Sequence, residues 1–394
     1  MHRQSRQLIA KTNEQRLTNA REALHYIIMH LKDSEIQFLD LVRYALNDIS
    51  IPESLTRPIN WSEIYQIAKK QAMLGITFDA LVKLSSTTKP SSELIIQWYT
   101  QANIIEKMSK IVNANIQDIV GKVRAGGLDV VLLKGQGLAQ YYPNPLHRHP
   151  GDIDLYFFDK YNEANDTAAQ WDNVTFNPDT SYHRSFTYKN IEIENHLVYV
   201  DFYCSRNRKA WQEIEKRIPL TGSETLQLGE FSVHVPQPQL NVIYVFLHSM
   251  HHLLQVGIGL RQICDWCCLW QKKHQQIDKE LFQWSVDKLK IRRSMTAMAY
   301  VVENYLGLEK GIIPLDTTTA KAKKDGEMII QDILSSGNFG HSTDIMKGFV
   351  RNAHINNLKS YYLAFKRQLK LFRLYPSEVI AYPAEWIKSK FKGS

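Results

Sequence analysis

Two short motifs constrain the fold of this chain most strongly: Leu133–Leu138 (LKGQGL) and Arg148–Leu155 (RHPGDIDL). The first ends the apolar run Val130–Leu133, so we expect a strand that leads into a glycine turn. In the second, Asp152 and Asp154 lie two positions apart and therefore on one face of a strand. Glycines let backbone N–H groups approach phosphate oxygens, and Mg²⁺ prefers oxygen ligands that it shares with phosphates. The motifs predict a site for a divalent metal and a triphosphate, as nucleotidyl transfer requires.

At these residues the chain resembles the nucleotidyltransferase superfamily, which includes the DNA polymerase β fold, the minimal nucleotidyltransferases and the antibiotic nucleotidyltransferases. The resemblance is closer to a bacterial branch whose pattern is LKG, a helix of small residues, YP, an arginine and GDIDL. It covers roughly residues 37 to 290. The segments that carry it are Leu133–Gly135, Leu138–Ala139, Tyr142–Pro143, Arg148 and Gly151–Leu155.

The glycine turn departs from the superfamily pattern. Most members have Gly-Gly or Gly-Ser there, whereas this chain has Gly135, Gln136 and Gly137. We expect the two glycines to cradle the triphosphate and Gln136 to replace the serine as a hydrogen-bond donor. Lys134 and Arg148 would offset the phosphate charge, because ammonium and guanidinium groups bind phosphates well.

Two-metal nucleotidyl transfer requires a third carboxylate beside Asp152 and Asp154. The run Ile191–His196 alternates apolar and polar residues, so Glu192, Glu194 and His196 share one face of a strand. Resemblance to the Glu-x-His element of the bacterial branch selects Glu194 as the third ligand or the base. Glu192 and Asp201 remain alternatives.

These residues imply a nucleotidyltransferase that depends on Mg²⁺ or Mn²⁺. It would move a nucleoside monophosphate from a nucleoside triphosphate, by default ATP, to an acceptor hydroxyl and release pyrophosphate. The acceptor stays open between a small sugar-like molecule, a protein hydroxyl and an RNA end. An alternative is a catalytically silent module of the same fold that binds nucleotide or a partner.

The expected fold class is α+β, with a polymerase-β-like mixed sheet between two helical regions. The predicted regions are 1–110 (helical), 111–237 (α/β core) and 238–394 (helical, with a basic tail). Apolar spacing predicts helices over residues 5 to about 120, one of them at Val112–Arg124, and a further helix at Lys160–Trp171. The predicted strands are Asp129–Leu133, Asp152–Phe158, Ser185–Tyr188, Ile191–Asp201 and Phe231–Val235, and helices follow from Leu240, with breaks near 307–319 and 337–340.

Composition places the chain in a reducing compartment. No apolar run approaches the roughly 18 residues of a membrane span, and the first residues lack the apolar stretch of a signal peptide. The expected location is therefore the cytoplasm. Four cysteines are too few for a disulfide framework in 394 residues. Cys264, Cys267 and Cys268 lie in an apolar helical context, which favours buried free thiols over a zinc site.

The histidines and the tail allow two interpretations each. His248, His251 and His252 have helical spacing without an HExxH glutamate, which favours a helix surface or a pocket wall over a metal site. For His183 and His196 a structural hydrogen bond is favoured, and Asp265 is expected to line the acceptor pocket.

In the tail, residues 359–392 hold eight basic side chains against two acidic ones, interleaved with aromatic residues. Aromatics packed on the body with lysines in solvent are favoured over contact with an anionic membrane or nucleic acid. Such a membrane contact would place the protein at the inner membrane surface.

Overall fold

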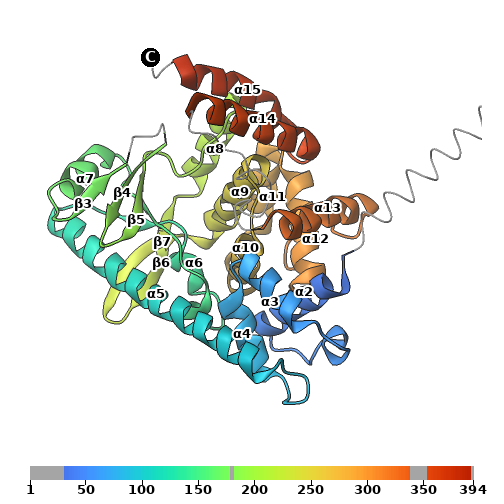
Figure 1. The fold of residues 1–394 in the computed structure, drawn as a ribbon. Helices are drawn as coiled ribbons and strands as arrows, with labels where there is room; N and C mark the ends of the chain where they lie inside the picture. Colours follow the sequence, from blue (N-terminus) through green and yellow to red (C-terminus); the bar gives the residue numbers. More distant parts are fainter. Residues whose placement is uncertain (1–30, 178–181, 338–352, 392–394) are drawn as a thin grey trace, which may run out of the picture.

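A mixed sheet lies between one long helix and a body of C-terminal helices (Figure 1). The computed structural model describes residues 31–177, 182–337 and 353–391, and the predicted helical stretch 5–30 lies outside them. Within these ranges the strands form a seven-stranded sheet in the order β3-β4-β5-β2-β1-β7-β6. The strands are β1 Val131–Leu132, β2 Ile153–Tyr156, β3 Val174–Phe176, β4 His183–Tyr188, β5 Ile191–His196, β6 Thr221–Leu228 and β7 Phe231–Pro236.

The helices precede, interrupt and follow this sheet. Before it come α2 Asp33–Leu46, η1 Glu53–Thr56, α3 Trp61–Lys70, α4 Leu74–Lys83 and α5 Ser92–Ala125. Between its strands lie α6 Gln136–Ala139, η2 Pro145–His147, α7 Tyr161–Ala168 and α8 Ser205–Arg217. After it come α9 Pro238–Gln255, α10 Leu260–Lys273, η3 His274–Gln276, α11 Lys279–Leu289, α12 Arg292–Tyr305, α13 Ala320–Ser336, α14 Ala353–Leu371 and α15 Pro376–Phe391.

Alternation along the central strands divides the core in two. Val130 and Leu132 pack with α5 and α7, whereas Val131 and Leu133 pack with the helices on the opposite face, including α9. In β2, Ile153 and Leu155 join the α5 side. Because side chains alternate in a strand, Asp154 must point to the other face, toward α9. The sheet therefore presents its polar central residues to the C-terminal helices.

The central pairing brings three strands together at the predicted site. Strand β2 is parallel to β5 and antiparallel to β1, and β1 is in turn parallel to β7. Strands β3, β4 and β5 form an antiparallel meander. The predicted strand Ile191–Asp201 is too long, because its partner β4 begins at His183, which pairs with His196. Strands β3 and β6 were not predicted.

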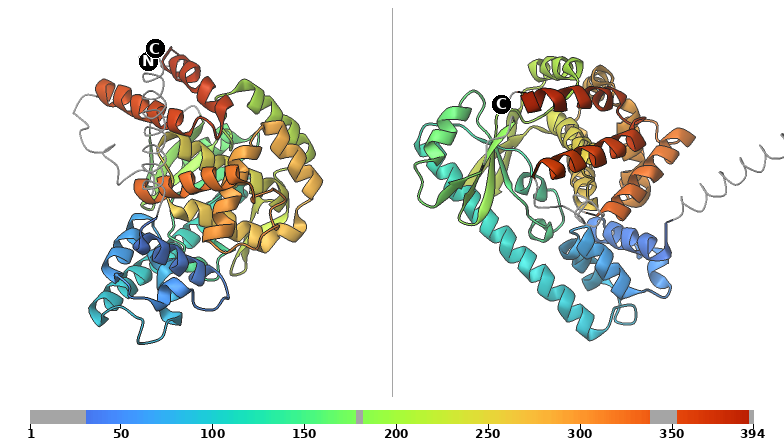
Figure 2. Two further views of the ribbon diagram at one scale, coloured as in Figure 1. Left: turned by 90° about the vertical axis from the view of Figure 1, so that its right-hand side faces the viewer. Right: turned by 45° about the horizontal axis from the view of Figure 1, so that its top comes forward.

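The N-terminal helices join the C-terminal body rather than standing apart. Lys70 of α3 donates to the carbonyl oxygens of Leu334 and Ser335, and the neighbouring Gln71 donates to Ile333. These contacts place the blue helices against α13 (Figure 2). The predicted helix Val112–Arg124 is the last part of α5, which runs without interruption through the proposed boundary at residue 110.

The basic tail packs on the body where its side chains are described. Arg367 and Lys370 both pair with Asp332, and Arg373 Nε lies 2.9 Å from Asp325. Leu371, Leu374 and Tyr375 are buried. The packing interpretation is therefore met in part: these side chains pack on the body, whereas Tyr362, Leu369 and Phe372 are exposed. The ion pairs to Asp332 and Asp325 give no support to an anionic surface contact.

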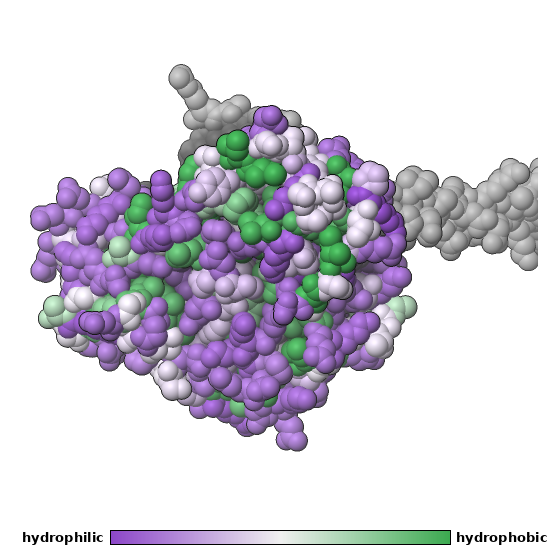
Figure 3. All heavy atoms as spheres, turned by 90° about the horizontal axis from the view of Figure 1, so that it is seen from below, coloured by the Kyte–Doolittle hydropathy of each residue, from purple (hydrophilic) through white to green (hydrophobic). Residues whose placement is uncertain are grey.

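The surface, the helices and the cysteines add three observations within the described ranges. The face seen in Figure 3 is largely hydrophilic, with apolar side chains in separate small patches. In the part of the chain that the structure describes, no helix combines the length and apolar character of a membrane span. Cys264, Cys267 and Cys268 are buried free thiols.

Candidate active site

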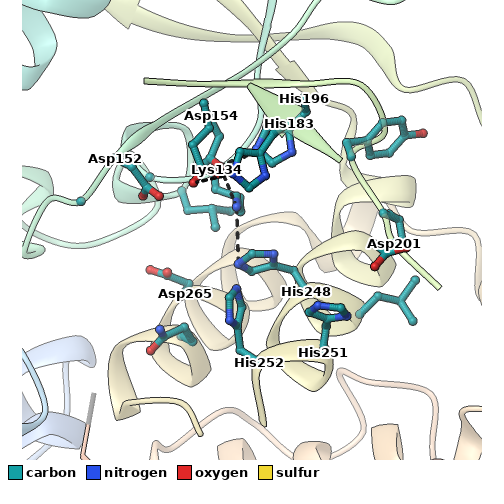
Figure 4. A pocket seen from close by; sticks show the side chains of 18 of the residues that line it. Lys134, Asp152, Asp154, His183, His196, Asp201, His248, His251, His252 and Asp265 are labelled. Atoms are coloured by element: carbon teal, nitrogen blue, oxygen red, sulfur yellow. Dashed lines mark hydrogen bonds and ion pairs between the residues drawn. The ribbon is translucent and has the colours of Figure 1, made fainter. Parts of the chain in front are cut away.

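A cavity of about 390 Å³ lies between the polar face of the sheet and helices α9 and α10. Side chains from the sheet form one wall, and three histidines of α9 form the wall opposite (Figure 4). The predicted residues Lys134, Gly135, Arg148, Asp152, Asp154 and Glu194 all line it. The two motifs, separated by nine residues in the sequence, are thus brought together with β5, which follows much later in the chain.

Three carboxylates converge on the sheet wall. Asp154 and Glu194 are side by side in the parallel β2–β5 ladder, and Asp152 comes just before β2. One oxygen of each carboxylate lies within 4.8 Å of the others. Of the alternatives, Glu192 is exposed outside the cavity, whereas Asp201 lines it. The geometry brings Glu194, rather than Glu192, to the aspartate pair.

The turn after β1 requires glycine at two positions for different reasons. Gly135 has φ +54° and ψ −115°, a conformation that other residues rarely adopt, and a Cβ there would lie 3.4 Å from the carbonyl oxygen of Asp152. Gly137 lies against β7, where a Cβ would be 3.2 Å from Val235 Cγ1. Its N–H donates to the carbonyl oxygen of Lys134. The turn therefore holds Gly135 at the cavity and packs Gly137 on the sheet.

Gln136 does not line the cavity as expected for a phosphate donor. Its side-chain amide is buried and donates to Asn113 Oδ1 of α5 at 2.7 Å. The side chain therefore ties the turn to the long helix instead of replacing the serine of related turns.

Lys134 contacts Asp154 directly and also reaches the opposite wall. Its Nζ lies 2.7 Å from Asp154 Oδ1 and 3.5 Å from His248 Nε2. Burial would lower the pKa of Lys134, but the charge of Asp154 holds it above the ordinary value. The ammonium is therefore charged at neutral pH and lies between the two walls.

The pKa values of the two aspartates are shifted in opposite directions. Burial would raise the pKa of Asp154, but Lys134 and His196 hold it well below its usual range. The neighbouring charge of Asp154 raises the pKa of Asp152 to about 6. Both carboxylates are ionised at neutral pH, with Asp154 ionised far more firmly.

Two histidines that we expected to be structural stand next to the carboxylates. His196 Nε2 lies 2.8 Å from Asp154 Oδ1 and 3.3 Å from Glu194 Oε2. His183 Nε2 lies 3.5 Å from Glu194 Oε1. His196 thus makes the kind of hydrogen bond that we expected, with Asp154 as its partner, and the alternation in β5 had placed it on the face of Glu194.

The α9 histidines form a pocket wall, which is one of the two interpretations favoured from sequence. His248, His251 and His252 line the cavity from one helix face. Burial, reinforced by the charge of Lys134, lowers the pKa of His251 to about 4 and that of His252 to about 3. This wall is therefore uncharged at neutral pH and offers imidazole hydrogen bonds opposite the acidic wall.

Arg148 forms a buried bidentate ion pair with Asp265 of α10. We had expected the arginine to contact phosphate and the aspartate to line the acceptor pocket, but not that the two would pair. Its Nε and Nη2 donate to the two carboxylate oxygens at 2.7 and 2.8 Å. Tyr142 also donates its hydroxyl to Asp265 Oδ1 at 2.7 Å. Both charged residues line the cavity, and the pair fixes the loop before β2 on α10.

Comparison with known proteins agrees with this geometry. No curated protein and no solved structure matches the chain. Residues 57–307 match the model of a family described as "Uncharacterised nucleotidyltransferase". The match spans most of the chain, includes both motifs, the glycine turn and the three carboxylates, and continues through α9 and α10. The chain therefore belongs to this family of uncharacterised nucleotidyltransferases.

Proposed function

We propose that this protein transfers a nucleoside monophosphate from a nucleoside triphosphate to an acceptor hydroxyl in a reaction that depends on Mg²⁺ or Mn²⁺. ATP is the default donor. The convergence of Asp152, Asp154 and Glu194 beside the Gly135 turn carries the proposal. Membership of a nucleotidyltransferase family supports the reaction class.

The donor set fits a hard divalent ion. Mg²⁺ binds oxygen at about 2.0–2.1 Å in octahedral geometry, so its ligand oxygens stand roughly 3 to 4 Å apart. The three carboxylates approach this spacing, with their oxygens within 4.8 Å. Bound there, the metal would neutralise triphosphate charge and lower the pKa of an attacking hydroxyl.

The proposed reaction assigns separate roles to the surrounding residues. The acceptor oxygen attacks the α-phosphorus, the bond from that phosphorus to the bridging oxygen breaks, and pyrophosphate leaves. Glu194 or Asp154 accepts the acceptor proton. Lys134 supplies positive charge beside the Gly135 turn, where the triphosphate would lie. Arg148 is neutralised by Asp265, so we assign it mainly to holding this wall in place.

The sheet topology supports a polymerase-β-like core. The aspartate strand β2 lies centrally between the strand that precedes the glycine turn and the strand that bears the third carboxylate. The residues proposed for phosphate and metal contacts all line the cavity, which supports this assignment. The acceptor stays open between a small molecule, a protein hydroxyl and an RNA end, and a cytoplasmic location stays a prediction.

One observation favours the alternative of a silent nucleotide-binding or assembly module. Asp154 already pairs with Lys134 at 2.7 Å and with His196 at 2.8 Å. These two partners already contact the oxygen that a metal would use, so a module in which they replace the metal would bind a ligand without catalysis.

Label transfer separates the two functions. Each α-³²P-labelled nucleoside triphosphate is incubated with the full-length protein, Mg²⁺ or Mn²⁺, and pooled small-molecule, protein or RNA acceptors. The proposal expects labelled product and pyrophosphate with one acceptor pool, and their loss in the double variant Asp152→Asn/Asp154→Asn. Glu192→Gln is the matched control, because this exposed carboxylate lies outside the cavity. Equal transfer by the double variant would refute the assignment.

A further inference from the structure

A second group of potential metal ligands shares Glu194 with the carboxylate site. His183 and His196 face each other directly across the β4–β5 ladder, and Glu194 lies two residues before His196 on the same strand. One ligand atom from each of the three residues lies within 4.8 Å of the others. The antiparallel ladder therefore fixes this group on the sheet rather than on loops.

The spacing within this group matches a tetrahedral zinc-type site. Zinc binds imidazole nitrogen and carboxylate oxygen at about 2.0–2.2 Å, so neighbouring ligands of a tetrahedral ion stand about 3.3 to 3.5 Å apart. His196 Nε2 lies 3.3 Å from Glu194 Oε2 and His183 Nε2 lies 3.5 Å from Glu194 Oε1, so each imidazole stands beside its own carboxylate oxygen. To bind such an ion, His196 would exchange its 2.8 Å contact with Asp154 for the metal.

Ligand chemistry distinguishes this group from the carboxylate site. Imidazole nitrogen favours zinc and its transition-metal neighbours, whereas Mg²⁺ favours oxygen. Two histidines and one carboxylate also leave positions open, as in catalytic rather than structural zinc sites. All three residues line the cavity, so an open position would face the bound substrates.

We propose that His183, Glu194 and His196 bind a second divalent metal of zinc-like ligand preference beside the carboxylate site. Glu194 then links the two cation sites, because it belongs both to this group and to the group of three carboxylates. This inference rests on the proposed function and adds to it a second metal, at a site whose imidazole ligands favour zinc over Mg²⁺. Its ion would lie on the β4–β5 side of the cavity, opposite the α9 wall.

Zinc binding to the full-length protein provides the test. The protein is stripped with a chelator, titrated with Zn²⁺ alone in competition with a chromophoric indicator, and examined by X-ray absorption at the zinc edge. We expect one zinc bound by two imidazoles and oxygen ligands. Since loss of an outer-shell partner alone weakens metal binding about 10–100-fold, loss of a direct ligand in His183→Gln or His196→Gln should weaken it at least 100-fold.

Two variants make the result specific. His252→Gln removes a histidine of the opposite wall and should bind zinc like the wild type. Asp152→Asn should keep zinc but lose Mg²⁺-dependent nucleotide binding, so failure of the proposed function can be told apart from failure of this inference. Circular dichroism checks that each variant is folded.

Three outcomes would overturn the proposal. They are the absence of zinc binding by the wild type, sulfur ligands from the buried cysteines in the absorption spectrum, and unchanged zinc affinity in a folded His183→Gln variant. The last two results would move the zinc elsewhere, and the first would leave the histidines as hydrogen-bond partners of the carboxylates.

Discussion

The ion pair between Arg148 and Asp265 should be one of the most sensitive points of the structure. Both side chains are only 5% exposed, and Asp265 accepts two hydrogen bonds from the guanidinium. Asp265→Asn keeps the size of the side chain but leaves Arg148 as a buried charge without its counter-ion. Removal of one partner of a buried pair typically costs about 3–5 kcal/mol. We expect a loss of that size in the free energy of unfolding.

Removal of all the polar groups together should be less harmful than removal of one. The triple variant Arg148→Met/Asp265→Leu/Tyr142→Phe replaces the pair and the hydroxyl that donates to it by apolar groups. Such replacement of a buried pair is often neutral or stabilising. We therefore expect the triple variant to recover at least about half of the loss.

Urea unfolding, followed by circular dichroism and tryptophan fluorescence, measures both variants. The slope of the free energy against urea concentration should stay constant, which shows that the comparison concerns stability alone. The reasoning is refuted if Asp265→Asn costs less than about 1 kcal/mol, or if the triple variant is as unstable as Asp265→Asn.

Three further predictions concern glycines and pH. Gly75→Ala should lower the free energy of unfolding by about 1–3 kcal/mol, because its Cβ would lie 2.3 Å from the carbonyl oxygen of His147. Gly121 is exposed in α5 with open space around it, so Gly121→Ala should raise that free energy by about 0.5–1 kcal/mol. Urea unfolding measures both. Gly135→Ala should weaken nucleotide binding measured by calorimetry, because the positive φ at the cavity strains a side chain by about 1–2 kcal/mol; unchanged affinity would contradict this. The pKa of Asp152 is raised to about 6, so this carboxylate is protonated at lower pH. Mg²⁺-dependent nucleotide binding, measured by calorimetry, should therefore weaken about tenfold per pH unit below pH 6. Asp152→Asn should show no such binding at any pH.

The stability of the metal-free protein should depend on pH in the opposite direction from nucleotide binding. The pKa of Asp152 in the folded state lies above its ordinary value of 3.8, so the folded protein holds this proton more tightly than the unfolded chain. The contribution of Asp152 to stability is therefore complete below pH 4 and is lost as the pH rises through 6. Thermal unfolding without metal should show Asp152→Asn gaining relative to wild type over this interval.

Sequence reasoning predicted the residues whose roles follow from local spacing. The Asp152–Asp154 pair, the strand that bears it and the glycine turn depend on alternation and on glycine geometry, which act within a few residues. The strands β3 and β6 were not predicted, because their residues are mostly half-exposed or exposed and show no clear apolar run.

The missed parts of the site depend on contacts between distant segments. Arg148 pairs with Asp265, and Lys134 meets His248, only because β1, β2 and the α9–α10 helices fold together. His183 comes next to Glu194 through the β4–β5 register, which the sequence left undetermined. For Gln136 the position in the turn was recognised, but its direction toward Asn113 depended on how α5 crosses the sheet.

Isothermal titration of each nucleoside triphosphate, with and without Mg²⁺, tests the central claim most directly. The account predicts that the wild type binds at least one of them only with Mg²⁺, that Asp152→Asn/Asp154→Asn loses this binding, and that Glu192→Gln keeps it. Metal-independent binding, or metal-dependent binding of equal strength in the double variant, would contradict the carboxylate site.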